Sequence, residues 1–505
     1  MNQLKAGAVL NYATIILRIL VSLLYTPYML RLMGQGEYGL YSLVASVISY
    51  LTVLDFGLGN AIVRYTAKFR AENKITEQYE MFGMFFVLYV LIGIVAFVIG
   101  LGLYLNVDVL FGTTMTFEEL EKARIMMLLL VLNLAVTFPM SIFGSIITAY
   151  ERFVFPRIIG IAHIVLNTVV MICLLEMGYR AVAVVVLQTI FNIITLTLNF
   201  IYCKYKLHIK ILFRNFQWGM LKEVAIYSFW IFLNVIMDRI YWSTGQFVLG
   251  AFVSTAAVAV FAIAIQLEGM YMQFSTAIVG VFLPKVTGMV ARNNNPQEIS
   301  NLFIRIGRIQ YIVISLILVG FIIFGRDFIY LWAGPDYDSA YVITLLFFVG
   351  LAIPLIQNLG ITILQARNQM KFRSLLYIFI AIISLVFQIF LAKRYGGVGC
   401  AIAISGALLL GHGLIMNVYY HKKQGLNICS FWYEILKMSV IPVILCVATK
   451  LLLRDIALDS WLSLGLAILV FTSIYVPLFY RFSMNQSERD LFVKPLITVM
   501  RKLKR

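Results

Sequence analysis

Residues 40–63 read LYSLVASVISYLTVLDFGLGNAIV, a run that is almost wholly apolar. An apolar run of at least about 18 residues is long enough to cross the hydrocarbon of a bilayer as a helix. Asp55 interrupts this run, and a carboxylate at that depth costs several kcal/mol unless it is paired, protonated or in contact with water. The segment therefore predicts a membrane span that carries an acid with a specific role.

The composition extends this prediction to the whole chain. Of the 505 residues 62% are hydrophobic and 12% are charged, and the mean hydropathy is +0.93. Soluble proteins carry about a quarter charged residues. We therefore expect an all-α polytopic membrane protein with about fourteen transmembrane helices. The predicted spans are 6–31, 40–63, 81–105, 125–149, 158–176, 181–202, 222–246, 256–284, 308–325, 341–365, 374–392, 397–420, 435–453 and 461–480.

The distribution of Lys and Arg predicts the orientation of these spans. Basic residues accumulate in cytoplasmic loops of membrane proteins. With the N-terminus inside, the N-terminal residues, every second loop and the C-terminal tail hold 29 of the 40 Lys and Arg residues. We therefore expect both termini to be cytoplasmic and the protein to lie in the cell (inner) membrane of a bacterium.

The net charge of +17 is explained by this asymmetry and by attraction to anionic lipids of the inner leaflet. We do not expect a nucleic-acid partner. The five cysteines lack the spacing of a metal site or of a disulfide framework.

A basic and aromatic segment, 203–219, divides six predicted helices from eight. It has the composition of an interfacial linker. We predict an N-lobe (1–202, six helices), this linker, a C-lobe (220–420, six helices), and a final segment (421–505) with two helices and a basic cytoplasmic tail. The two six-helix lobes are expected to enclose a central cavity.

An internal similarity supports the two lobes. Residues 14–35 align without gaps with residues 230–251, at an offset of 216. Polar and aromatic residues recur in both helices at steps of 3, 4, 4 and 3, which places each set on one helix face. The two sets are Asn11, Thr14, Arg18, Ser22 and Tyr25, and Tyr227, Trp230, Asn234, Asp238 and Tyr241. A face in contact with lipid has no use for such a stripe.

Two blocks resemble a known family. RLMGQGEYGLYSLVASVISYLTVLDFGLGNAIVRYTAKF (31–69) is similar to the N-terminal signature of polysaccharide biosynthesis flippases, in which an aspartate-x-glycine motif follows a first helix with an arginine. GPDYDSAYVITLLFFVGLAIPLIQNLGITILQARNQMKFRS (334–374) is similar to a later region of the same family. The chain is thus identified as a member of the multidrug/oligosaccharidyl-lipid/polysaccharide exporter superfamily.

The resemblance implies a flippase that moves an undecaprenyl-pyrophosphate-linked oligosaccharide from the cytoplasmic to the outer leaflet by alternating access, for surface polysaccharide synthesis. The implied partners are this lipid-linked glycan, the bilayer, and a polysaccharide polymerase and glycosyltransferases. The alternatives are a cation-coupled exporter of drugs or small molecules with the same fold, and a lipid II flippase. An enzyme is not expected, because the outer loops are short and contain no histidine.

Three charged residues within spans are the leading site candidates. Arg18 lies roughly 20 Å from the cytoplasmic end of its helix at 1.5 Å per residue, and its planar guanidinium suits a pyrophosphate. Asp55 and Glu268 are candidates for pairing with Arg18 or for coupling transport to H⁺ or Na⁺. Asn11, Ser22, Tyr25, Asn60, Asn234 and Asp238 are the other residues predicted to line the cavity. No catalytic residue, metal site or bound cofactor is predicted.

Overall fold

A computed structural model describes residues 3–216, 218–279, 282–292, 295–367 and 369–491. Within these ranges the chain forms helices joined by short connections, and no strand occurs. Contacts divide the chain into two compact units. Unit 1 comprises Met1–Ala262 and Leu385–Gly399, and unit 2 comprises Ile263–Ser384 and Cys400–Arg505. The boundaries predicted at residues 202, 219 and 420 stay predictions.

The elements of the first half of the chain are α1 (Gln3–Met33), α2 (Gln35–Leu51), η1 (Thr52–Asp55), α3 (Leu58–Ala71), α4 (Ile75–Leu105), α5 (Val107–Phe111), α6 (Phe117–Ala149), α7 (Val154–Glu176), α8 (Ala181–Ile201), η2 (Tyr202–Lys206), α9 (Trp218–Trp242) and α10 (Thr244–Phe252). Those of the second half are α11 (Thr255–Val279), α12 (Leu283–Arg292), α13 (Pro296–Ala333), η3 (Pro335–Tyr337), α14 (Ser339–Ile356), α15 (Leu359–Ala366), α16 (Met370–Leu408), η4 (Leu409–Met416), α17 (Asn417–Lys422), α18 (Ile428–Leu452) and α19 (Trp461–Phe482).

The prediction of an all-helical polytopic membrane protein is confirmed. Twelve helical runs among the described residues are long and apolar enough to cross a bilayer. One of these, Met370–Lys422, is divided at Gly396, whose φ of 57° and ψ of −138° interrupt the helix. When this division and α9 are counted, the helices correspond one to one to the fourteen predicted spans.

The boundaries of several spans were predicted wrongly. The predicted span 40–63 is not one helix, because α2 ends at Leu51 and α3 begins at Leu58. The span 256–284 is likewise divided into α11 and α12, and 341–365 into α14 and α15. In contrast, α13 is 38 residues long although its predicted span is 308–325. Hydropathy finds only the stretch that suits lipid, whereas backbone hydrogen bonds continue a helix into polar residues.

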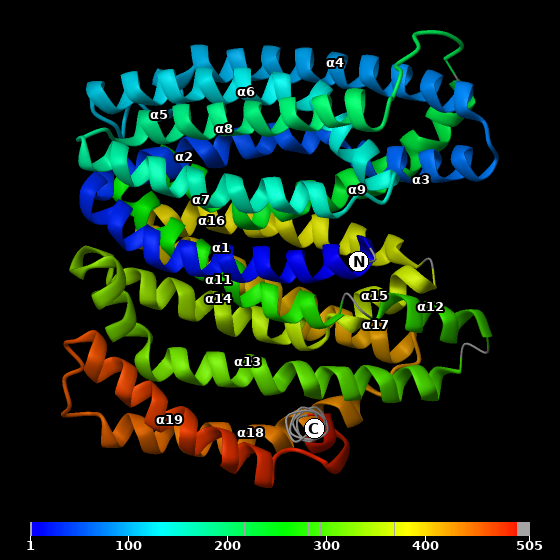
Figure 1. Ribbon diagram of the computed structural model, residues 1–505. Helices are drawn as coiled ribbons and strands as arrows, with labels where there is room; N and C mark the ends of the chain where they lie inside the picture. Colours follow the sequence, from blue (N-terminus) through cyan, green and yellow to red (C-terminus); the bar gives the residue numbers. More distant parts are fainter. Residues whose placement is uncertain (1–2, 217, 280–281, 293–294, 368, 492–505) are drawn as a thin grey trace, which may run out of the picture. The chain divides into compact units, whose positions relative to one another are not determined.

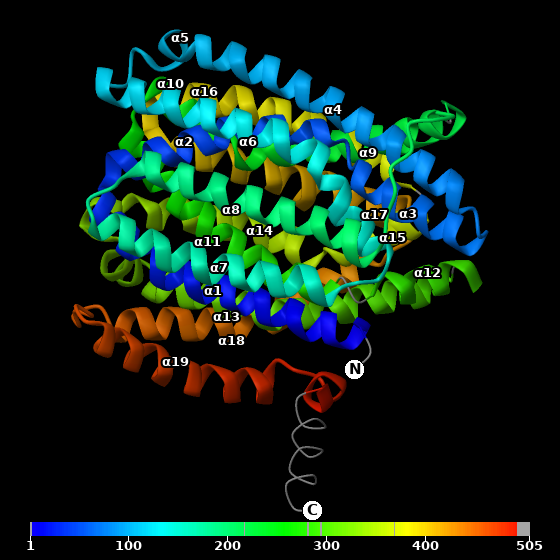
Figure 2. The same ribbon diagram turned by 45° about the horizontal axis from the view of Figure 1, so that its top comes forward.

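Unit 1 contains a layer of long helices. Figure 1 shows α4, α6 and α8 lying alongside one another, and Figure 2 shows α1 beside α7. Two glycines of α4 permit the close approach to α6. A Cβ on Gly93 would lie 2.8 Å from the carbonyl oxygen of Ala135, and one on Gly100 would lie 2.5 Å from Val131. Small residues at such crossings let helix backbones pack closely inside a membrane.

The basic linker follows α8 and η2 and is not helical over residues 207–216. It runs along the start of α4, where the amide of Leu212 donates to the carbonyl of Tyr79 at 3.1 Å. A Cβ on Gly83 would lie 2.0 Å from the Leu212 carbonyl oxygen, so this glycine makes room for the linker. Tertiary contacts with α4 hold the linker, and the side chain of Phe213 meets that of Phe86 edge to face.

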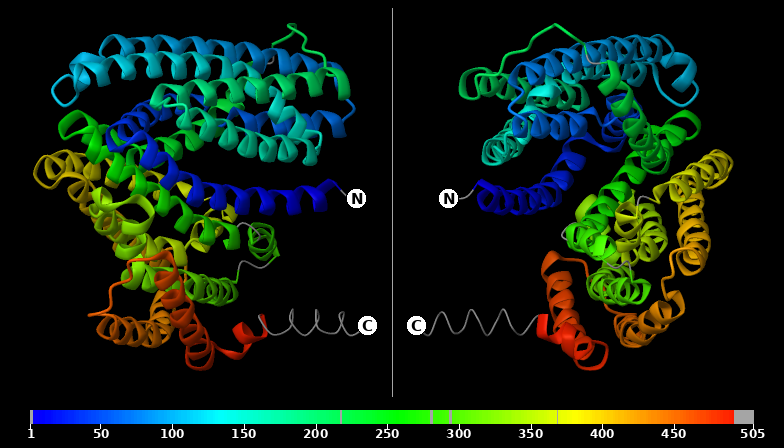
Figure 3. Two further views of the ribbon diagram at one scale, coloured as in Figure 1. Left: turned by 60° about the vertical axis from the view of Figure 1, so that its left-hand side comes forward. Right: turned by 90° about the vertical axis from the view of Figure 1, so that its right-hand side faces the viewer.

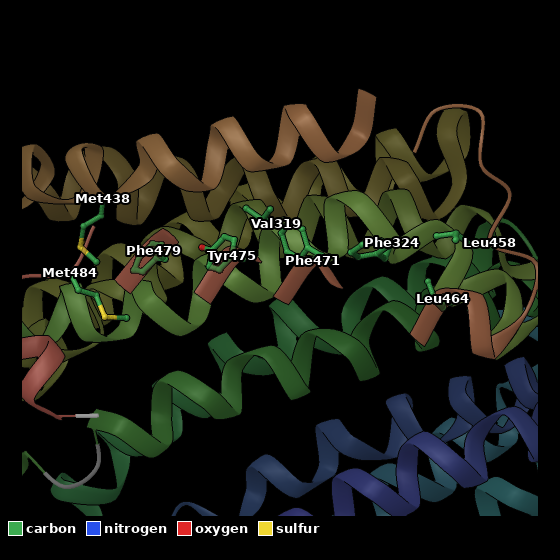
Figure 4. Packing of buried hydrophobic residues seen from close by; sticks show 9 residues of the cluster. All are labelled: Val319, Phe324, Met438, Leu458, Leu464, Phe471, Tyr475, Phe479 and Met484. Carbon is green, nitrogen blue, oxygen red and sulfur yellow. The ribbon is translucent and has the colours of Figure 1, made fainter. Parts of the chain in front are cut away.

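In unit 2 the last two helices pack on α13, as Figure 3 shows. An apolar cluster lies between α13, α18 and α19 (Figure 4). Its nine buried members are Val319, Phe324, Met438, Leu458, Leu464, Phe471, Tyr475, Phe479 and Met484. The two C-terminal helices therefore share one hydrophobic core with α13.

A buried ion cluster stands at one end of this core. Nε of Arg308 lies 2.6 Å from Oε1 of Glu488, and its Nη2 lies 2.9 Å from Oε2 of the same carboxylate. Nη1 pairs with Glu434 of α18, and Nη2 donates to the carbonyl of Ser483 at 3.2 Å. The side chains of Arg308 and Glu488 are 6% and 0% exposed. One guanidinium thus joins α13, α18 and the segment that follows α19.

Candidate functional site

Four predicted site residues lie on α1 in unit 1. The side chain of Arg18 is exposed, and those of Asn11, Ser22 and Tyr25 are partly buried. No ion pair among the described residues includes Arg18. Its guanidinium is close enough to His163 of α7 to interact with that ring electrostatically. Within the described part of the chain, the charge of Arg18 is therefore not neutralised by a carboxylate.

Asp55 lies where the second span is broken. Phe56 and Gly57 follow it with φ values of 51° and 67°, and α3 begins after them. The Asp55 carboxylate lies near the Tyr89 hydroxyl and the backbone of Gly57, close enough to interact with both. Tyr89 is buried in α4 and lies near Ser141 of α6. Asp55 thus faces two neighbouring helices at the break, and the described residues show no ion pair between Asp55 and Arg18.

Helix α9 packs against this break. The rings of Phe56 and Phe232 stack with centroids 4.7 Å apart. Nη2 of Arg239 donates to Oγ1 of Thr52 at 3.3 Å. On α9 the predicted site residues Asn234 and Asp238 are partly buried and exposed, respectively. The structure thus brings the first helix of the second predicted repeat to the broken second helix of the first.

Two further predictions have a defined position. Asn60 lies on α3 with an exposed side chain. Glu268 lies on α11 in unit 2 and is 3% exposed. On the same face as Glu268, the ring of Tyr271 stacks on Phe348 at 4.1 Å, and the Ser275 hydroxyl donates to the carbonyl of Leu355 at 2.8 Å. The side chains of Tyr227 and Trp230, and the basic tail beyond residue 491, lie outside the described residues.

A polar network along α8 links the helices of unit 1. Nε2 of Gln188 donates to the Tyr41 hydroxyl at 2.7 Å. Nδ2 of Asn192 lies 2.8 Å from both Oδ1 of Asn133 and Oγ1 of Thr137 on α6. Hydrogen bonds of this kind join helices inside a bilayer. Neither composition nor spacing indicated Tyr89, Ser141 or His163, because tyrosine, serine and a single histidine in a span have no distinctive pattern.

The motif EYGLY (37–41) has a structural explanation. The Glu37 carboxylate pairs with Lys122 of α6 and accepts from the amide of Ala181, at the start of α8, at 3.2 Å. A Cβ on Gly39 would lie 1.9 Å from the carbonyl oxygen of Thr255, so α2 and the first turn of α11 touch backbone to backbone. The motif therefore holds the start of α2 against three other helices.

We expect Gly39→Ala to destabilise the protein by about 2 kcal/mol, since a forced methyl group in a packed contact costs roughly 1–3 kcal/mol. The matched control is Gly36→Ala on the same helix, where a Cβ would meet Glu119 Oε1 at 3.8 Å and Thr255 Oγ1 at 4.0 Å, both at ordinary contact distance. Alanine there should be neutral or slightly stabilising, because it favours helix over glycine. Thermal unfolding of the two variants in detergent tests this, and equal melting temperatures would contradict the close contact.

Unit 2 contains an apolar pocket of about 310 Å³. Residues of α11, α13, α14 and α19 line it, among them six phenylalanines, and none of the lining residues is charged. Gly320 of α13 is one of these residues, and a Cβ there would have no neighbour within 4 Å. The pocket therefore has room for an apolar guest, and its lining contains no charged side chain.

No group of three or more His, Cys, Asp or Glu side chains in the described ranges could hold a metal ion. Coupling to Na⁺ or H⁺, for which Asp55 and Glu268 are candidates, stays a prediction.

A comparison with models of known protein families shows the family of this chain. The family model of the polysaccharide biosynthesis protein matches residues 4–290. The chain belongs to this family. The match covers more than half of the chain, including the motif at 37–41 and the broken second span. No curated protein sequence matches the chain.

Solved structures show that this family member has the fold of a known group of transporters. It is similar to the lipid II flippase MurJ in an inward closed conformation, with a TM-score of 0.70, 18% identity, and coverage of 94% of this chain and 98% of that one. The chain is also similar to an inward-facing multidrug resistance transporter of the MATE family and the MOP superfamily, with a TM-score of 0.59, 15% identity, and coverage of 86% of this chain and 96% of that one. For a MOP superfamily transporter from Pyrococcus furiosus the TM-score is 0.54 and the identity is 15%, with coverage of 83% of this chain and 96% of that one. The expected polysaccharide biosynthesis family is confirmed by the family model, and these structures show that the fold is shared with the flippase and the two transporters.

Proposed function

We propose that this protein moves an undecaprenyl-pyrophosphate-linked oligosaccharide from the cytoplasmic to the outer leaflet, by alternating access, for the synthesis of a surface polysaccharide. The observation that carries the proposal is the uncharged, phenylalanine-lined pocket between α11, α13, α14 and α19. A hydrocarbon chain fits such a pocket, whereas a cationic drug would find no carboxylate in its lining. The family relationship supports the same substrate class.

In this proposal Arg18 binds the pyrophosphate. Its charge is exposed within an apolar helix and has no carboxylate partner among the described ion pairs. Asn11, Ser22, Tyr25, Asn60, Asn234 and Asp238 would contact the sugar. A polysaccharide polymerase and glycosyltransferases would be the partners that use and supply the substrate.

The pocket provides the test. In liposomes that contain the purified protein, we expect Gly320→Leu to slow flipping of a long-chain polyprenyl-pyrophosphate oligosaccharide by about fivefold or more. The bilayer is as apolar as the pocket, so the affinity comes from packing. The loss of about ten carbon contacts, at ~0.1 kcal/mol each, weakens the binding free energy by about 1 kcal/mol. This corresponds to about a fivefold loss of affinity.

The matched control is Gly465→Leu on α19, which also meets open space but does not line the pocket. It should flip the same substrate at the normal rate. A short-chain analogue should be flipped equally by both variants and the unchanged protein. If Gly320→Leu flips the long-chain substrate normally, the pocket does not hold the chain. Export of cationic drugs without any flipping would favour the drug-exporter alternative.

A further inference from the structure

A second groove in unit 2 is formed by two parallel rows of side chains along η4, α17 and Lys423, the residue that follows α17. The rows are Leu414, Val418 and Lys422, and Ile415, Tyr419 and Lys423, and their members follow one another at intervals of four residues. Residues four apart lie one above the other on a helix. Each row therefore begins with an apolar side chain and ends, roughly 12 Å further along at 1.5 Å per residue, with a lysine.

The groove has a volume of about 500 Å³ and a rigid aromatic wall. Phe372 of α16 stacks on Tyr419 with ring centroids 4.2 Å apart and an angle of 12° between the planes. Leu414 and Val418 are 60% and 51% exposed, so the apolar part of the groove is open to whatever surrounds the protein. In a membrane-spanning helix, that surrounding is the lipid hydrocarbon.

The shape of the groove depends on a π-helical stretch. Residues Leu409–Met416 form this stretch, and π-helical turns occur often at functional sites. Nδ2 of the buried Asn417 donates to the carbonyls of His412 and Gly413 at 2.8 and 2.9 Å. Its Oδ1 accepts from Gln357 at 2.7 Å and from Trp432 at 3.1 Å. These bonds fix the wider helix behind the groove.

The charged end of the groove is basic only. Neither residues 366–375 nor residues 409–430 contain an aspartate or glutamate. Both Lys422 and Lys423 are exposed, and neither belongs to an ion pair in the described part of the chain. The positive-inside asymmetry predicts that this end faces the cytoplasm, where the leaflet carries the anionic lipids.

We propose that this groove binds one anionic glycerophospholipid of the cytoplasmic leaflet. Its phosphate lies between Lys422 and Lys423, and one acyl chain follows Leu414 and Val418 against the stacked Phe372 and Tyr419. The bound lipid would keep the π-helical segment covered in the membrane. This role is independent of the transported substrate, because the groove and the phenylalanine-lined pocket share no lining residue.

The test measures lipid binding without transport. The purified protein is titrated with phosphatidylglycerol and, separately, with phosphatidylcholine of the same chains, and the bound lipids are counted by native mass spectrometry. We expect one tightly held phosphatidylglycerol. The double variant Lys422→Gln with Lys423→Gln should bind it about thirtyfold less tightly, since each lysine near the surface contributes about 1 kcal/mol and 1.4 kcal/mol is tenfold. Val418→Trp, which keeps both lysines, should also weaken binding by obstructing the chain.

The matched control is Lys204→Gln with Lys206→Gln, two exposed lysines within the other π-helical turn, η2. This pair should leave the affinity for phosphatidylglycerol unchanged. Equal losses in the two double variants would show that diffuse positive charge attracts the lipid, and the site would be rejected. Displacement by inorganic phosphate, or preferential displacement by a polyprenyl phosphate, would also overturn the assignment, since the groove would then bind a free anion or the transported lipid.

Discussion

Arg308→Met is expected to lower the free energy of unfolding by about 3–5 kcal/mol, because removal of one partner leaves a buried charge uncompensated. The charge in question is Glu488, which is 0% exposed and bound through both oxygens to the guanidinium. Loss of this anchor should release the segment after α19 and loosen α18 and α19 from α13. Thermal and urea unfolding of the purified protein would measure the loss.

Helix α13 also contains the control for this experiment. Arg326 pairs with Asp338 at 2.8 Å, but the two side chains are 69% and 50% exposed. Exposed pairs contribute about 0–1 kcal/mol, so Arg326→Met should be nearly neutral. The double change Arg308→Met with Glu488→Leu should recover most of the stability, since an apolar pair can replace a buried ion pair at little cost. Equal effects of Arg308→Met and Arg326→Met would show that the cluster is not a structural anchor.

Arg18→Ala is expected to reduce flipping of the lipid-linked oligosaccharide by about 100-fold at low substrate, while the amount of folded protein stays the same. Two hydrogen bonds to a charged group at about 1.5 kcal/mol each give about 3 kcal/mol, which is roughly this factor. Folding should be unaffected, since no described ion pair includes Arg18. Arg18→Lys should recover activity only in part, because an ammonium lacks the planar pair of donors.

The control is Arg157→Ala, which removes an exposed arginine from α7, the helix beside α1. It should flip substrate normally. If Arg18→Ala transports at the normal rate, Arg18 does not bind the pyrophosphate. If it disappears from the membrane instead, Arg18 is a packing residue.

Asp55→Asn separates binding from turnover in the same assay. Asparagine has the shape of aspartate, and its amide oxygen is still an acceptor, so the break between α2 and α3 should persist without its charge. We expect slower turnover with nearly unchanged substrate affinity, because an acid that pairs with Arg18 after substrate release would lower the cost of returning the empty, positively charged carrier. An equal loss of affinity in Asp55→Asn and Arg18→Ala would assign Asp55 to the substrate site.

The features that depend on local composition could be predicted without the structure. The length and apolarity of each run decided which segments form spans, because a bilayer accepts only backbone that is hydrogen-bonded within a helix. The unusual residues within these runs, Arg18, Asp55 and Glu268, were visible for the same reason. The aspartate with two following glycines at 55–59 indicated a special site, and a break in the helix lies there.

The partners of such residues became known from the folded structure. Asp55 lies near Tyr89, Glu37 pairs with Lys122, and Arg308 reaches Glu488, which is 180 residues away. Gly39 and Gly83 are likewise explained only by the backbone that passes each of them, at Thr255 and Leu212. Hydropathy acts on each segment alone, whereas these contacts depend on which helix faces meet and at what distance. That arrangement is set by packing and hydrogen bonding between segments far apart in the chain, and no local pattern encodes it.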